Sequence, residues 1–139
     1  MFIAILFILF ITFLLGWYTG QSVQDEIVPS RKYLEFGIDV LLLLMIALAL
    51  FNYGQRTLAI VVVLALIVCR RFFSFSYAYA PISGVVLGAA TLLAADMQII
   101  ILTLCLLMNF LLGATAKQKL LLKVGVMQPI VAFVLFALL

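Results

Sequence analysis

Two carboxylates near the start of an apolar stretch, Glu35 and Asp39, are the residues best suited to chemistry in this chain. They are four residues apart, so a helix places both on one face, near the cytoplasmic boundary of the span proposed below. Two neighbouring carboxylates bind a cation or hold a shared proton, because repulsion between like charges favours neutralising one of them. The alternative is structural, and the sequence favours it: the pair complements the helix start and forms salt bridges with Arg31 and Lys32.

Asp96 is the only acidic residue in the second half of the chain. At a tight turn, its side-chain oxygen accepts hydrogen bonds from the N–H groups that begin the next helix. Buried in a membrane, the same carboxylate is costly and becomes a further candidate for an ion or proton site. We expect the cap, with the turn at Ala95 and Asp96.

Catalytic and metal-binding constellations are absent from the sequence. The chain has no histidine for acid–base chemistry, and it contains no zinc-protease, P-loop or serine-hydrolase motif. Cys69 and Cys105 lie in apolar runs and are interpreted as small apolar residues rather than a disulfide or a metal pair. We therefore expect a protein that is not an enzyme and holds neither a metal nor a cofactor.

A run of small residues between positions 80 and 95 is suited to helix packing. Gly84 and Gly88 form a G-x-x-x-G pattern, in which glycine lets two helix backbones approach closely within a lipid bilayer. We predict that this helix is the axis on which the other spans pack. Its predicted packing residues are Ala80, Gly84, Gly88, Thr91 and Ala95.

The composition places the chain in a membrane. Of its 139 residues, 69% are hydrophobic and 9% are charged, whereas soluble domains average about 25% charged residues. The mean hydropathy is +1.44. The formal charge of +3 lies in short clusters between apolar runs, which indicates orientation in a membrane rather than binding to nucleic acid. We expect one all-α integral membrane domain over residues 1–139, with the lipid bilayer as its surroundings.

Apolar runs of bilayer length define the expected spans. A bilayer core is about 30 Å thick and needs about 20 helical residues. The polar link of residues 20–34 contains Pro29, which argues against a continuous helix there. The expected spans cover residues 2–19, 34–53, 56–73, 80–95, 97–114 and 121–139.

The stretch from 84 to 114 is ambiguous, and the distribution of basic residues decides it. One long helix, with Asp96 at mid-membrane, gives five spans and divides the basic residues four against four. Two helices give six spans and gather seven of the eight basic residues on one side, leaving Arg56 on the other. Because cytoplasmic links are rich in Lys and Arg, we predict six spans with both termini on the non-cytoplasmic side. The seven predicted interfacial basic residues are Arg31, Lys32, Arg70, Arg71, Lys117, Lys119 and Lys123.

Two functions fit these features. The first is a non-catalytic, multi-spanning membrane component that acts by helix packing within a homo-oligomer or a larger membrane complex. It follows from the small-residue helix and from the scarcity of charge within the spans. The alternative is a small ion or solute transporter or channel that uses the Glu35 and Asp39 face.

Overall fold

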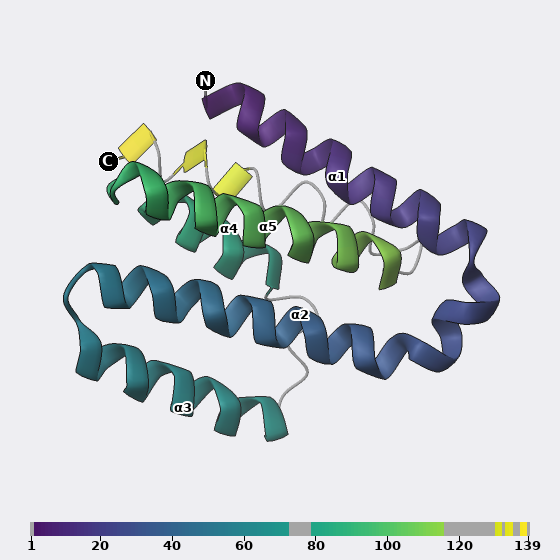
Figure 1. The fold of residues 1–139 in the computed structure, drawn as a ribbon, viewed down its shortest axis with the longest axis horizontal. Coiled ribbons are helices and arrows are strands. Elements are labelled where there is room, and N and C mark those ends of the chain that lie inside the picture. The colour runs from purple at the N-terminus through teal and green to yellow at the C-terminus, as the bar shows by residue number, and fades with distance from the viewer. Residues whose placement is uncertain (1, 73–78, 116–129, 132, 135–136, 139) are drawn as a thin grey trace.

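The chain folds into packed α-helices. The computed structural model describes residues 2–72, 79–115, 130–131, 133–134 and 137–138, and these ranges contain no strand (Figure 1). The all-α prediction is thereby confirmed. The predicted helix over 121–139 lies mostly outside the described residues. The helices are α1 (Phe2–Ser22), α2 (Gln24–Asn52), α3 (Arg56–Phe72), α4 (Tyr79–Ala90) and α5 (Ala95–Thr115).

The link between α1 and α2 is shorter than predicted. Only Val23 separates the two helices, and Pro29 lies inside α2. The prediction of a non-helical link was wrong because the first turns of α2 are largely exposed. Proline removes one helical hydrogen bond, and in an exposed turn water can solvate the carbonyl that loses its partner.

The turn between α2 and α3 lies between the expected spans 34–53 and 56–73. Gly54 has a positive φ of 75°, a conformation that glycine adopts without steric cost. The Tyr53 and Gly54 N–H groups donate to Ala49 O and Phe51 O, which closes the end of α2. In Figure 1, α3 turns back and runs antiparallel beside α2.

The ambiguous stretch from 84 to 114 forms two helices. Helix α4 ends at Ala90 and α5 begins at Ala95, so a single long helix with Asp96 at its middle is wrong. The turn falls at residues 91–94, a few residues earlier than predicted. The side chain of Gln98 closes it, because Nε2 donates to Thr91 O over 3.1 Å and to Leu93 O over 2.8 Å.

Helices α2 and α5, rather than the small-residue helix α4, form the centre of the described fold. Helix α2 contacts the other four described helices and α5 contacts α1, α2 and α4, whereas α4 contacts only α2 and α5. The buried side of α5 repeats at helical spacing through the apolar residues Ile101, Cys105, Met108 and Leu112. The long aliphatic side chains of this helix fill the space between three neighbours, which small residues alone cannot do.

Glycines join α1 to α5 at very short range. A Cβ added to Gly16 would lie 2.8 Å from the carbonyl carbon of Phe110, and one added to Gly20 would lie 2.9 Å from the Cα of Ala114. From the side of α5, a Cβ added to Gly113 would lie 2.8 Å from the backbone nitrogen of Trp17. Residue numbers rise together along both helices, so α1 and α5 run parallel.

Helices α2 and α4 also run parallel to each other. The Tyr79 hydroxyl at the start of α4 contacts Asp39, and the Tyr53 hydroxyl at the end of α2 contacts Ala89 at the end of α4. Because α1 and α2 are joined at Val23, the two parallel pairs run in opposite directions. The C-terminal ends of α1 and α5 therefore lie at the same end of the molecule as the start of α2.

Two helices, α2 and α5, are long and apolar enough to cross a membrane, and one-third of the most apolar window of each is buried within the chain. Shorter apolar helical stretches occur at Phe7–Ser22, Arg56–Cys69 and Pro81–Ala90. Helix α3 contacts α2 and no other described helix. Its outward side is aliphatic and exposed, and consists of Leu58, Ile60, Val61, Leu64, Ile67 and Val68.

Candidate functional site

A buried carboxylate links α2 to α4. Asp39 is 5% exposed, and its Oδ1 accepts a hydrogen bond from the Tyr79 hydroxyl, which is also buried. Ser83 follows Tyr79 by one helical turn and is fully buried. The α2–α4 contact thus brings a carboxylate to a phenolic hydroxyl, next to a second hydroxyl-bearing residue on the same side of α4.

Asp39 lies in the middle of α2. Helix α2 has 29 residues, and Asp39 is about 20 Å from each end at a rise of about 1.5 Å per residue. The neighbouring buried residues of α2 are apolar, among them Ile38 and Leu42. The predicted place near a helix start was wrong because α2 begins ten residues earlier than the predicted span.

Glu35 does not share this site. Its side chain is 49% exposed and accepts a hydrogen bond from Arg31 Nε over 2.9 Å, within the same helix. This exposed pair at i, i+4 contributes about 0.3–0.5 kcal/mol. The two predicted roles of the carboxylates are therefore divided: Glu35 forms the predicted salt bridge, and Asp39 forms the buried polar contact. Lys32 is exposed on the same turns.

Asp96 is exposed in the first turn of α5. The Gln98 N–H donates to Ala94 O, so Ala94 precedes the first helical residue and Asp96 lies inside the helix rather than at its cap. The carboxylate there complements the positive end of the helix dipole. Asp96 and Asp39 lie at separate places in the fold, because Asp39 contacts the start of α4 whereas Asp96 follows its end.

The predicted packing residues divide between two elements. Gly84 and Gly88 are buried in α4, and Ala80 belongs to the same helix. Thr91 is half-buried in the turn that follows, where its hydroxyl donates to Gly88 O. Ala95 is exposed in α5, so the predicted stripe ends where α4 ends.

Other polar side chains also join helices. The Tyr53 hydroxyl donates to Ala89 O over 2.7 Å, and Asn109 Nδ2 donates to Leu9 O over 3.4 Å. Both bonds join different helices. The sequence contains no signal for Tyr53 and Tyr79, because aromatic residues at span ends are also expected to face the membrane interface.

The predicted interfacial basic residues are described only in part. Arg70 and Arg71 belong to the last turns of α3, which ends beside the middle of α2 in Figure 1. Lys117, Lys119 and Lys123 lie outside the described residues and follow α5 in the sequence. Arg56 begins α3 at the opposite end, with its guanidinium carbon 5.7 Å from the centre of the Phe51 ring.

Neither cysteine forms a disulfide; Cys69 is exposed and Cys105 is buried. Within the described ranges, no three His, Cys, Asp or Glu side chains come together in an arrangement that could hold a metal ion. Comparison with known proteins finds no matching family model, no similar curated protein and no similar solved structure.

Proposed function

We propose that this chain is a multi-spanning membrane protein that acts without catalysis, through helix packing in a homo-oligomer or a larger membrane complex. The supporting observation is the use of its polar groups and glycines. Asp39, Tyr53 and Asn109 each bind another helix, and the glycines of α1 and α5 interlock. The outward side of α3 is aliphatic and suits a neighbouring subunit, whereas the outward side of α1 is apolar with aromatic residues and suits lipid.

The same proposal includes six crossings with both termini on the non-cytoplasmic side. The opposite directions of the α1–α5 and α2–α4 pairs support alternating crossings. They also support one end that collects cationic links, because Arg31 and Lys32 lie in the first third of α2 near that end and α5 ends there. Cytoplasmic links are enriched in Lys and Arg.

Measurement of the particle mass in a mild detergent tests the packing role. We expect either several copies of the chain or a stoichiometric second protein, seen by light scattering or native mass spectrometry. Substituting Val61→Trp and Val68→Trp together adds bulk to one side of α3, and we expect the assembly to dissociate. Leu15→Trp on the exposed side of α1 is the control. A chain that is monomeric and without a partner in a lipid nanodisc would contradict the proposal.

A second candidate, movement of an ion or proton, is favoured by the burial of Asp39. For a crossing over the expected span 34–53, Asp39 lies five residues inside the span, about 8 Å into a hydrocarbon core of about 30 Å. Ionisable groups at that depth commonly mark ion or proton pathways. Flux into proteoliposomes is the test: we expect Asp39→Asn to abolish it and Glu35→Gln to preserve it. An absence of flux into vesicles that contain the wild-type protein would exclude the transport candidate and leave packing as the one remaining role.

A further inference from the structure

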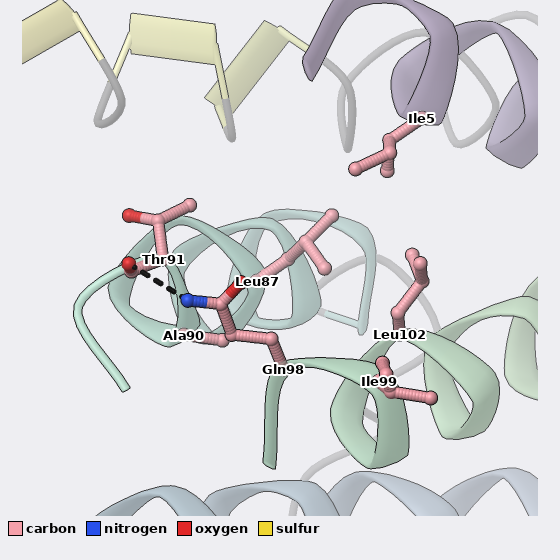
Figure 2. A pocket seen from close by; sticks show the side chains of 7 residues that line it. All are labelled: Ile5, Leu87, Ala90, Thr91, Gln98, Ile99 and Leu102. Atoms are coloured by element: carbon pink, nitrogen blue, oxygen red, sulfur yellow. Dashed lines mark hydrogen bonds between the residues drawn. The ribbon is translucent and has the colours of Figure 1, made fainter. Parts of the chain in front are cut away.

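An apolar cavity of about 330 Å³ lies between the start of α1, the end of α4 and the start of α5. Figure 2 shows its aliphatic lining from these three helices, with Ile5 facing Leu87 and Leu102 across the space. Ile99 is 63% exposed and forms part of the rim, so the cavity opens to the outside. Apolar cavities of about 150 Å³ already stay free of water and accept hydrocarbons, so this space suits an alkyl chain.

One polar group of known orientation faces the cavity. Gln98 Nε2 donates to two backbone carbonyls, Thr91 O and Leu93 O, which accept only. These bonds fix the amide orientation, and the remaining Oε1 must be an acceptor. Figure 2 shows the Gln98 amide with its oxygen on the side of Leu87, inside the lining.

The charge around the cavity selects the polar end of a ligand. None of the lining residues is basic, and Asp96 lies two positions before Gln98 on the first turn of α5. An anionic headgroup would therefore meet a carboxylate and an amide acceptor, with no basic side chain among the described residues that line the cavity. A ligand with an uncharged hydrogen-bond donor complements both the acceptor and the charge.

We propose that this cavity binds the hydrocarbon chain of an uncharged lipid whose polar end is a hydroxyl group, such as a long-chain alcohol or an acylglycerol. The hydrocarbon chain of the lipid lies between Ile5, Leu87 and Leu102, and the lipid hydroxyl donates to Gln98 Oε1. The site uses the α4–α5 turn, so it lies apart from the Asp39 contact at the start of α4.

Equilibrium binding of two matched probes, oleyl alcohol and oleate, tests the proposal on the purified full chain in detergent. The probes share a hydrocarbon chain and differ in the polar end. We expect saturable binding of one oleyl alcohol per chain and about tenfold weaker binding of oleate, which corresponds to about 1.4 kcal/mol. Equal binding of the two probes, or binding that does not saturate, would overturn it.

Three variants locate the binding. Leu102→Trp fills the cavity and should abolish saturable binding, whereas Leu107→Trp on an exposed side of the same helix should leave it unchanged. Gln98→Leu removes the acceptor and should erase the preference for the alcohol. Since Gln98 also closes the turn, its variant is interpreted only with an unchanged helical circular-dichroism spectrum. The two tryptophan variants locate the site without the Gln98 variant. Equal binding of oleyl alcohol by Leu102→Trp and Leu107→Trp would contradict the proposal.

Discussion

The Tyr79 hydroxyl shows how much one side chain adds to the contact between two helices. Asp39 and Tyr79 are 40 positions apart, and their contact depends on the packing of α2 against α4. The sequence identifies Asp39 as one of two candidate acids but not its partner, because tyrosines near span ends also face the interface. Only the packed arrangement distinguishes a buried tyrosine from an interfacial one.

Removing this hydroxyl should destabilise the fold. Tyr79→Phe keeps the ring and leaves a buried carboxylate without this donor, so we expect the free energy of unfolding to fall by about 1–3 kcal/mol. Denaturation in mixed detergent micelles, followed by circular dichroism, measures it. Tyr18→Phe alters an exposed residue and should leave the midpoint unchanged. Equal midpoints for the two variants would show that the Asp39 contact contributes little.

At the scale of elements, the glycine contacts between α1 and α5 bring the two helix backbones into direct contact. The sequence contains two G-x-x-x-G patterns, Gly16 with Gly20 and Gly84 with Gly88. The prediction uses only the second, whose neighbours are also small; the first follows a run of Phe, Ile and Leu and encloses Trp17, Tyr18 and Thr19. That choice missed the role of Gly113, a single glycine whose partners are 96–100 positions earlier in the chain.

Alanine substitution separates close-packed glycines from free ones. In Gly16→Ala the new methyl overlaps the backbone of Phe110, which cannot move away as a side chain can, so we expect a loss of at least about 1–3 kcal/mol. In Gly37→Ala the nearest atom is Leu111 Cδ1 at 3.8 Å, an ordinary contact. There the gain in helix propensity, about 1 kcal/mol, should appear as unchanged or increased stability. Similar thermal unfolding midpoints for both variants would contradict the α1–α5 packing.

Pro29 is a second case in which the structure departs from a local sequence rule, because this proline lies inside helix α2. Its effect is limited because the surrounding turn is exposed, and sequence alone does not reveal how a polar link is solvated. Pro29→Ala restores a helical N–H and should stabilise α2, up to the roughly 3 kcal/mol that an interior proline costs. Pro81→Ala, in the first turn of α4 where no N–H partner is expected, should change stability little. Hydrogen exchange at residues 24–30 measures the first effect locally, and unchanged protection there would count against a regular helix.

At the scale of the whole molecule, helix type and helix ends were more predictable than helix neighbours. Apolar runs and breakers such as Gly54 mark where helices form and stop. The central position of α5 depends on how long side chains fill space between three helices. Hydropathy does not contain that information, because Leu and Ile face lipid and neighbouring helices equally well.

Cysteine labelling in oriented vesicles tests the arrangement of the helix ends. Cys69→Ala removes the exposed native thiol, while Cys105 is buried. In that background we expect Lys32→Cys and Asp96→Cys to react with a membrane-impermeant maleimide from opposite sides. Reaction of both from the same side would exclude alternating crossings, and protection of position 96 from both sides would return Asp96 to the membrane interior.

The pairing of the first and last described helices has a consequence for biosynthesis. Gly16 and Gly113 are 97 positions apart, and a ribosome adds about 5–20 residues per second. Helix α1 therefore waits about 5–20 s after its own synthesis before α5 is available. During that interval its glycine surface is open to other small-residue helices, and a chaperone or a lipid that shields α1 would favour correct assembly of the nascent chain.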